Sequence, residues 1–591
     1  MSAEVDEPLD RAYDAGLLRR LLVYLKPYGV QVGLAVLLLL VGAALTLLAP
    51  ALTQRALDVA IPRRDVGLLG TLAALFAIGL VLEFLAEYGQ TLLTTLVGQR
   101  VMFDLRLQIF QHLQRLGIPY FDRHPVGRLM TRVTSDVETL NELFSSGVVT
   151  VFGDLFTIAA IMVMMLAIDW RLALVAFAVI PLVWLTVTLF RRYVRGTFRE
   201  IRHRVARLNS FLQEHISGVR VVQLFGREAD TSRRFRVVND EHLRAHLRSI
   251  TVYAVFFPAI EVLTAVALAL LLWYGGLRTL QGTLTVGVLA AFIQLTRRFF
   301  QPLQDLSEKF NLLQSAMASS ERVFRLLDEP MTVPEPDRPR VLPRPVRGAI
   351  SFEGVWFRYG DSAPWVLKDV TFTASPGETV ALVGATGAGK TTIVNLLLRF
   401  YDPVRGRITV DGIDIRELST AELRGLLGFV QQDLFLFTGD ILHNLTLDAP
   451  IGLDAAHTAA RRVGADRFIE RLPAGYAHVL GERGRSLSVG ERQLLSFARA
   501  LALDPVILVL DEATSSVDAE TEAQIQQAIG ELMVGRTSLV VAHRLSTILH
   551  ADRILVMHHG EIRERGTHRE LLAARGLYER LYQLTATAAA S

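Results

Sequence analysis

Six apolar stretches dominate the first half of the chain, at residues 29–52, 66–92, 146–168, 171–192, 250–275 and 284–305. Each is close to the roughly 20 helical residues that cross about 30 Å of hydrocarbon. None shows the two-residue alternation of a barrel strand, and only a helix satisfies its own backbone in lipid. The pattern therefore predicts an α-helical transmembrane domain with six helices.

Polar connections of two lengths join these stretches. Short connections near 53–65, 169–170 and 276–283 alternate with long ones at 93–145 and 193–249, and the second long one is rich in arginine. Arginine-rich connections stay on the cytosolic side of a membrane. We therefore expect both long connections to be helical and cytosolic. Before the first span, residues 16–26 mix leucine with basic residues, which favours a helix lying along the membrane surface; a plain extension of the first span is the alternative.

The second half of the chain has a different character. Residues 329–348 contain six prolines and predict a stiff linker. From Ala349 onward, β-rich runs such as TVALVG and VILVLD alternate with helical ones, which is typical of an α/β domain. We expect a transmembrane domain at 1–328, a linker at 329–348 and an α/β domain at 349–591.

Composition narrows the chemistry. Of the 591 residues, 51% are hydrophobic, none is cysteine, and the net charge is +3. Disulfides and thiolate chemistry are thereby excluded, and so small a charge does not favour nucleic-acid binding. The acidic start at residues 1–14 differs from the basic start of a cleavable signal peptide, so the first span is expected to direct its own insertion.

The most specific motif is GATGAGKTT, which follows the apolar run TVALV and matches a phosphate-binding loop. Its backbone N–H groups are expected to surround the phosphates of ATP at the start of a helix. Lys390 supplies a positive charge and Thr391 a ligand for Mg²⁺. The predicted ATP-binding residues in this motif are Gly384, Ala385, Thr386, Gly387, Ala388, Gly389, Lys390, Thr391 and Thr392.

Two carboxylates follow a second apolar strand, at Asp511 and Glu512. The carboxyl ends of parallel strands form the ligand-binding edge of such a sheet. We expect Asp511 to hold Mg²⁺ and Glu512 to orient or deprotonate the water that attacks the γ-phosphate. ATP and Mg²⁺ are the predicted cofactors.

Together these motifs resemble those of the ATP-binding cassette (ABC) transporter family, and the resemblance covers nearly the whole chain. It implies that Tyr359 in FRYG stacks on adenine, that Gln432 in VQQD takes part in catalysis and binds Mg²⁺, and that His543 in AHRLS contacts the γ-phosphate. Gln431 is an alternative to Gln432. Asp518 is placed in the loop between facing cassettes.

The resemblance extends to the turn that binds the ATP held by an opposite subunit. This signature is LSVGE here, with Ser488, Val489, Gly490 and Glu491, whereas the family's usual form is LSGGQ. Glu491 adds a negative charge where the helix dipole faces a phosphate, and Val489 adds bulk. We therefore expect a heterodimer, in which Glu512 hydrolyses ATP completed by a homologous half-transporter subunit. A tolerated variant with full activity is the alternative.

In the first half, YFDRHPVGRLMTRVTSDV and EHISGVRVVQLFGRE resemble the two cytosolic loops by which exporters of this family grip their cassettes. The implied function is ATP-driven export of amphipathic drugs, lipids or peptides by alternating access across the cytoplasmic membrane, with both termini and the ATPase domain cytosolic. Membrane lipids are further partners. A homodimeric lipid flippase is the alternative, and the six spans argue against a soluble DNA-maintenance ATPase.

Ionisable residues inside membrane spans are costly and therefore candidates for substrate contact. Glu261, Glu83 and Glu87 are the candidates, and the two last share one helix face. Asp154, Arg297 and Arg298 also lie in predicted spans. Ion pairing among these charges is an equally good interpretation.

Overall fold

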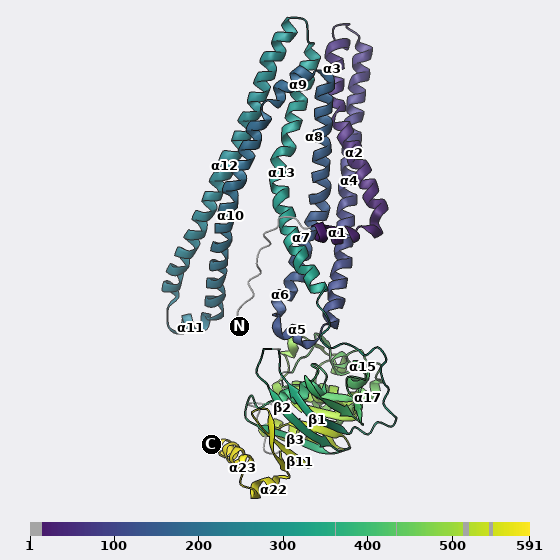
Figure 1. The fold of residues 1–591 in the computed structure, drawn as a ribbon, viewed down its shortest axis with the longest axis vertical. Coiled ribbons are helices and arrows are strands. Elements are labelled where there is room, and N and C mark those ends of the chain that lie inside the picture. Colours follow the sequence, from purple (N-terminus) through teal and green to yellow (C-terminus); the bar gives the residue numbers. More distant parts are fainter. Residues whose placement is uncertain (1–14, 361, 433, 512–518, 543–547, 591) are drawn as a thin grey trace. The chain divides into compact units, whose positions relative to one another are not determined.

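The computed structural model describes residues 15–360, 362–432, 434–511, 519–542 and 548–590 (Figure 1). The chain divides into two compact units. The helical unit holds Met1–Gln114 and Val126–Glu329, and the α/β unit holds Arg115–Pro125 and Pro330–Ser591. Eleven residues from the first long connection thus belong to the α/β unit.

Long helices form the helical unit. A short helix, α1 (Ala15–Val23), precedes the long ones. The remaining α-helices are α2 (Gly29–Thr46), α3 (Leu48–Arg55), α4 (Val66–Arg115), α6 (Val126–Thr131), α7 (Val137–Glu142), α8 (Val148–Ile168), α9 (Trp170–Phe177), α10 (Ile180–Ser217), α11 (Val219–Leu224), α12 (Glu228–Leu280) and α13 (Val286–Leu327).

Within the described residues, five helical stretches are long and apolar enough to cross a membrane: Lys26–Ala60, Val66–Arg115, Val151–Ile168, Trp170–Ser217 and Glu228–Leu280. No more than 28% of any of these apolar windows is buried. Such exposed apolar surface needs a lipid environment. The sixth predicted span coincides with the start of α13, so the count of six is consistent with the structure and stays a prediction.

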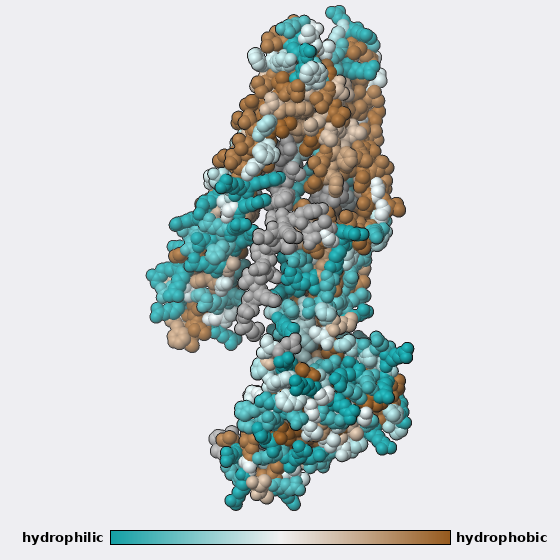
Figure 2. All heavy atoms as spheres, viewed as in Figure 1, coloured by the Kyte–Doolittle hydropathy of each residue, from teal (hydrophilic) through white to brown (hydrophobic). Residues whose placement is uncertain are grey.

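The long connections are helical, as the sequence predicted. The first continues α4 to Arg115 and then forms α5 (Ile118–Arg123), α6 and α7, while the second consists of the ends of α10 and α12 joined by α11 (Figure 1). Figure 2 shows hydrophilic residues over the ends of α10 and α12 near α11, and hydrophobic residues along the other part of these helices. The change in polarity along each helix marks where the predicted span ends.

The short connection expected near 53–65 is shorter than predicted. Helix α3 runs to Arg55 and a π-helix continues to Ala60, which leaves a turn over 61–65. A hydrogen bond from the Arg64 amide to the Ile61 carbonyl, 3.1 Å long, closes that turn. The polar residues of this segment therefore extend the helix instead of ending it.

The α/β unit contains two main sheets. One has the strand order β12-β11-β3-β10-β9-β6, and all its pairs are parallel except β11 with β12. Its strands are β3 (Thr379–Gly384), β6 (Leu427–Val430), β9 (Ile507–Asp511), β10 (Thr537–Val541), β11 (Arg553–His558) and β12 (Glu561–Gly566). The other is antiparallel, with order β2-β1-β4-β5, from β1 (Ile350–Phe357), β2 (Leu367–Ala374), β4 (Arg405–Val410) and β5 (Ile413–Asp414).

The remaining elements of the α/β unit are shorter. A two-stranded ribbon pairs β7 (Gly439–Asp440) with β8 (Val479–Leu480). The helices are α14 (Lys390–Leu397), α15 (Thr420–Gly425), α16 (Ile441–Thr446), α17 (Leu453–Arg462), α18 (Asp466–Ile469), α19 (Val489–Ala502), α20 (Ala519–Met533), α22 (His568–Ala573) and α23 (Leu577–Ala590).

The parallel sheet has a hydrophobic core on each face. Alternate residues of a strand point to opposite faces. Leu382 of β3 and Val509 of β9 pack in the core that includes α14, whereas Val383 of β3 and Leu510 of β9 pack in the core that includes α19 and α20. Helices α14 and α19 therefore lie on opposite faces of one sheet.

Candidate nucleotide-binding site

The loop between β3 and α14 requires glycine at several positions. Gly387 and Gly389 have φ values of 80° and 102°, in the left-handed region that glycine favours. A Cβ at Gly384 would lie 2.4 Å from the carbonyl oxygen of Met557, and one at Gly389 would lie 2.6 Å from a methyl group of Leu367. Ala385 and Thr386 at the tip are exposed. The backbone of this loop is therefore compact and open to solvent, as a phosphate-binding loop must be.

Lys390 begins α14 and is only 6% exposed. Its ammonium group donates to the carbonyl oxygens of Gly384 at 2.7 Å and Ala385 at 3.1 Å. Burial lowers the pKa of Lys390, and the charge of Asp511 opposes that shift. The loop thus holds a cation at its centre, next to the helix end that favours anions.

The carboxyl ends of β3, β9 and β6 lie along one edge of the parallel sheet. Asp511 is the last residue of β9, is buried, and pairs in register with Val541 of β10. Gln431 and Gln432 follow β6 directly, and both are exposed. Thr391, in the first turn of α14, is also exposed. These oxygen-bearing side chains fit the ligand preferences of Mg²⁺.

Three predicted site residues, Glu512, Asp518 and His543, lie outside the described residues. Their positions in the chain follow from their neighbours. Glu512 comes directly after β9, and His543 comes two residues after β10. Their roles stay predictions.

Tyr359 follows β1 and is 39% exposed. Its hydroxyl shares a 3.0 Å hydrogen bond with the hydroxyl of Thr392 in α14. The ring meets Phe357 and Tyr401 edge-on, with centroid distances of 4.9 and 5.1 Å. Tyr359 is therefore fixed beside the phosphate loop while part of its surface stays open for a stacking base.

Sequence reasoning missed a second tyrosine beside the site. Tyr401 follows α14, is 8% exposed, and donates its hydroxyl to the carboxylate of Asp122 in α5. Burial raises the pKa of Tyr401, and the hydrogen bond to Asp122 adds to that shift. The only sequence signal was YFDR inside a loop already expected to grip the cassette. No pattern linked it to a tyrosine 279 residues away.

The signature turn closes on itself. Ser488 is the N-cap of α19, and its hydroxyl accepts from the amide of Glu491 at 3.2 Å. The Glu491 carboxylate accepts from the amide of Ser488 at 2.8 Å, which completes a capping box. Val489 is 45% exposed, and a Cβ at Gly490 would lie 2.1 Å from a methyl group of Thr521 in α20.

The substrate candidates in the helical unit differ in their contacts. A carboxylate oxygen of Glu83 lies 3.7 Å from the guanidinium of Arg298 and accepts from the hydroxyl of Thr46 at 3.0 Å. Asp154 forms an ion pair with Lys309. Glu87 and Glu261 are exposed on α4 and α12. Glu83 thus has a partner among the charges singled out in the sequence, whereas the partner of Asp154 was not among them, and the substrate roles stay predictions.

Comparisons with known proteins agree with this arrangement. Family models named ABC transporter transmembrane region and ABC transporter match residues 32–303 and 367–515. The "Probable multidrug resistance ABC transporter ATP-binding/permease protein YheH" of Bacillus subtilis is 39% identical, over 85% of this chain and 75% of that protein. The ATP-dependent lipid A-core flippase of Syntrophus aciditrophicus is 36% identical, over 96% of this chain and 94% of that protein.

A solved structure extends the agreement to the whole fold. A bacterial Atm1-family ABC exporter with ATP bound has a TM-score of 0.78 and 27% identity, covering 97% of this chain and 99% of the other. Both of its parts, the apolar helices and the nucleotide-binding sheet, are therefore shared with known exporters. The chain belongs to the ABC transporter family, as a multi-pass membrane exporter whose ATPase is coupled to transport.

Proposed function

We propose that this chain is one half of a heterodimer that exports amphipathic drugs, lipids or peptides across the cytoplasmic membrane by alternating access. The observation that carries the proposal is the placement of α14 and α19 on opposite faces of one sheet. We infer that a phosphate loop and a signature turn so arranged serve two different ATP molecules, and that a second cassette completes each site. ATP binding closes the paired cassettes, and hydrolysis resets them.

In the proposed ATP site, Tyr359 stacks on adenine and the loop from Gly384 to Gly389 surrounds the phosphates. Lys390 neutralises phosphate charge. Bound Mg²⁺, held by Thr391, Gln432 and Asp511, would polarise the phosphate oxygens. Glu512 orients or deprotonates the attacking water, His543 contacts the γ-phosphate, and Asp518 faces the partner cassette.

We prefer a homologous second subunit, here called the sibling, to a second copy of this chain because of the signature turn. The capping box places the Glu491 carboxylate on the first turn of α19, where it satisfies the Ser488 amide. Negative charge at a helix N-terminus opposes the binding of a phosphate. We infer that the sibling's ATP, which meets this turn, is hydrolysed slowly, while ATP bound by this chain meets the sibling's better signature.

Domain limits and orientation belong to the same proposal. We assign the transmembrane domain to 1–328, the linker to 329–348 and the nucleotide-binding domain to 349–591, with both termini and the ATPase domain in the cytosol. The Pro-rich segment lacks helix and named strand throughout 329–348, all of which is described. Cysteine chemistry plays no part, because the chain has no cysteine.

The experiment that tests the pairing is purification in mild detergent from the native host, followed by intact-mass analysis of the partner. Two masses, one of them a homologous half-transporter, are the expected result. A complex of this chain alone that transports and hydrolyses ATP at both sites would contradict the heterodimer. ATP hydrolysis measured on the same preparation tests the enzymatic part separately.

A homodimeric lipid flippase is the second candidate, because the flippase relative matches 96% of this chain. Transport into sealed vesicles distinguishes the substrate classes when a labelled lipid, a cationic dye and a labelled peptide are compared. Lipid movement alone, by a complex with one mass, would favour the flippase.

Glu261 is the first substrate candidate to test, because its carboxylate is exposed on α12. Glu261→Gln is expected to reduce transport of the cationic dye. Glu83→Gln is the comparison variant, since Glu83 already has Arg298 as a partner. Unchanged dye transport and ATPase stimulation in Glu261→Gln would remove this residue from the proposed substrate site.

A further inference from the structure

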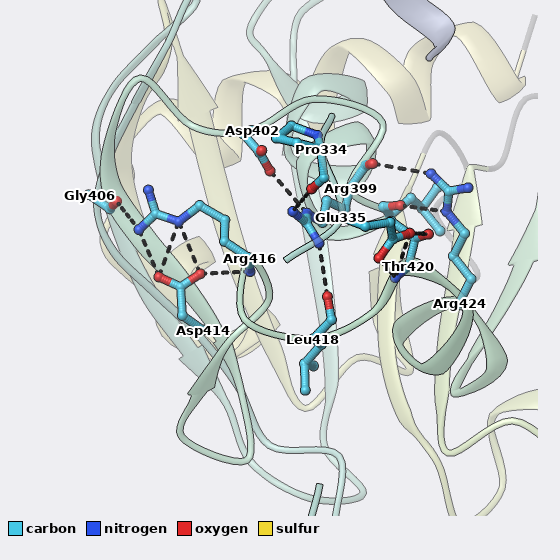
Figure 3. A network of polar contacts seen from close by, with 11 residues as sticks. Pro334, Glu335, Arg399, Asp402, Gly406, Asp414, Arg416, Leu418, Thr420 and Arg424 are labelled. Carbon is cyan, nitrogen blue, oxygen red and sulfur yellow. Dashed lines mark hydrogen bonds and ion pairs between the residues drawn. The ribbon is translucent and has the colours of Figure 1, made fainter. Parts of the chain in front are cut away.

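The short loop Arg399–Asp402, here called the receiving loop, directly follows the C-cap of α14, the helix that begins with Lys390. Arg399 is only 2% exposed although it is charged. Its guanidinium donates to the carbonyl oxygens of Leu418 and Pro334, both at 2.9 Å, and to the carboxylate of Asp402 at 3.2 Å. Figure 3 shows Pro334 and Leu418 approaching Arg399 from two other segments, and Asp402 from within the receiving loop itself.

This network fixes the receiving loop. A buried guanidinium is costly unless its nitrogens find acceptors, and here each of the three nitrogens donates to one. Arg424 adds two bonds from outside, at 3.2 Å to the carbonyl oxygens of Leu398 and Arg399 (Figure 3). Pro334 and Glu335 belong to the linker, and Glu335 accepts from Thr420 (Figure 3). One end of the linker is thereby held against the receiving loop, which follows α14.

A second segment reaches the same loop through Tyr401. Its hydroxyl donates to Asp122 of α5, and its ring lies edge-on to Tyr359 at 5.1 Å. The neighbouring Arg123 donates to the carbonyl oxygen of Tyr359 at 3.4 Å. Tyr359 in turn is bonded to Thr392 of α14. Helix α5 therefore contacts Tyr359, the candidate adenine residue, in two ways. Arg123 bonds to the backbone carbonyl of Tyr359, and Asp122 bonds to Tyr401, whose ring packs on the ring of Tyr359.

We propose that Tyr401 is a positioning residue that couples α5 to adenine binding, with the receiving loop as its rigid support. The inference rests on the proposed role of Tyr359 as the adenine-stacking residue. Helix α5 lies in the connection between the second and third apolar stretches, so helix movements in that region are passed to Asp122. The hydroxyl of Tyr401 carries the coupling to Asp122, whereas its ring sets the place of Tyr359. Coupling of this kind is reciprocal, so adenine binding biases α5 by the same factor.

The test uses the full chain with its partner in lipid nanodiscs. The chain contains no cysteine, so cysteines introduced at Arg63 and Gln281 are its only labelling sites for spin labels. These exposed positions lie in two different inter-helix turns of the helical unit. The readouts are the ATP-induced change in label distance, the KM for ATP and kcat.

In Tyr401→Phe, we expect kcat to stay at the level of the unsubstituted protein and the KM for ATP to rise by no more than the factor by which the coupling falls, because the two effects are reciprocal. The equilibrium between the two label distances with ATP should shift about tenfold toward the ATP-free value, which is the factor that one hydrogen bond to a carboxylate supports. Tyr401→Ala should show the same shift and a larger rise in KM than Tyr401→Phe, because Tyr359 also loses the ring beside it. Asp122→Ala should match Tyr401→Phe, and the double variant should be no worse than either. Asp122→Asn should retain coupling, since its amide oxygen can still accept.

Tyr578→Phe is the matched control. Tyr578 is also buried, and its hydroxyl has a 2.6 Å hydrogen bond to His568 in the same unit. This variant should leave KM and the distance equilibrium unchanged. Normal coupling in Tyr401→Phe, or additive losses in the double variant, would overturn the inference. Absence of ATP hydrolysis in the unsubstituted complex would instead overturn the proposed function, and the role of Tyr401 with it.

Discussion

Two turns of the α/β unit each lead into a helix, and they differ in how they treat that helix's first amides. At α14 the N-cap is Gly389, which offers no side-chain cap, and Lys390 supplies positive charge. At α19 the N-cap is Ser488, and Glu491 completes a capping box with negative charge. The turn before α14 therefore leaves its backbone amides available to an anion. The turn before α19 uses its own side chains to accept from two of its amides, those of Ser488 and Glu491.

This difference indicates which of the two turns contributes more to ATP hydrolysis. A helix N-terminus attracts anions with roughly half a positive charge, an effect of about 0.3–1 kcal/mol near the surface. The α14 turn adds a buried ammonium group to that attraction, and the α19 turn opposes it with a carboxylate. The comparison therefore predicts unequal contributions of the two turns to ATP hydrolysis by the assembled exporter.

The largest effect is expected from Lys390→Met, which removes the cation from the α14 turn. Loss of one such electrostatic group lowers a rate by about 100-fold or more. If this chain holds the main hydrolytic site, ATPase activity of the whole complex should fall by that amount. The measurement is phosphate release by the purified complex. Retention of half the activity would show that the two sites contribute equally, against the comparison.

The next largest effect is expected on the stability of the cassette, when a glycine of either turn is replaced by alanine. Gly490→Ala forces a Cβ to 2.1 Å from Thr521, and such overpacking costs about 1–3 kcal/mol. In Gly387→Ala the new Cβ would meet no neighbouring atom, so the only expected cost is backbone strain at a φ of 80°. Gly530→Ala, in the same helix as Thr521 and with open space, is the control. The unfolding midpoint of the cassette should fall most for Gly490→Ala and should not fall for Gly530→Ala.

A smaller effect is expected from Ser488→Ala, which removes one side of the capping box. Loss of an N-cap hydroxyl costs about 1 kcal/mol. Thr567→Ala is the matched control, because Thr567 and Glu570 form the same motif at α22, away from the signature turn. Both variants should lower the unfolding midpoint to a similar extent. Only Ser488→Ala should also change ATPase activity; equal activity in both would leave the signature cap a purely structural feature.

The sequence predicted the fold, and the place of the glycine-rich loop between β3 and α14, because both depend on local patterns. Apolar runs of membrane length, and GATGAGKTT after a buried strand, are readable within a few dozen residues. The first inter-helix turn was misjudged, since helix propagation to Ala60 depends on neighbours that no polar pattern reveals. The Asp122–Tyr401 contact and the buried hydrogen bonds of Arg399 could not be predicted, because their partners are separated in the chain and no local pattern links them. The charge at Glu491 was visible, but its capping geometry was not.

The finest test of the comparison is Glu491→Gln, which removes the negative charge and keeps a side-chain oxygen able to accept from the Ser488 amide. Stability should therefore hardly change. If charge is what slows the sibling's ATP, hydrolysis at that site should rise about two- to fivefold, the factor that corresponds to a helix-end charge. Phosphate release should be measured with Lys390→Met also present, so that only the sibling's ATP is turned over.

Glu570→Gln, the same change in the other capping box, should leave the rate unaltered. A rise only when Val489→Gly is added would assign the slow site to the bulk of Val489, and no rise in either variant would make LSVGE a fully tolerated signature.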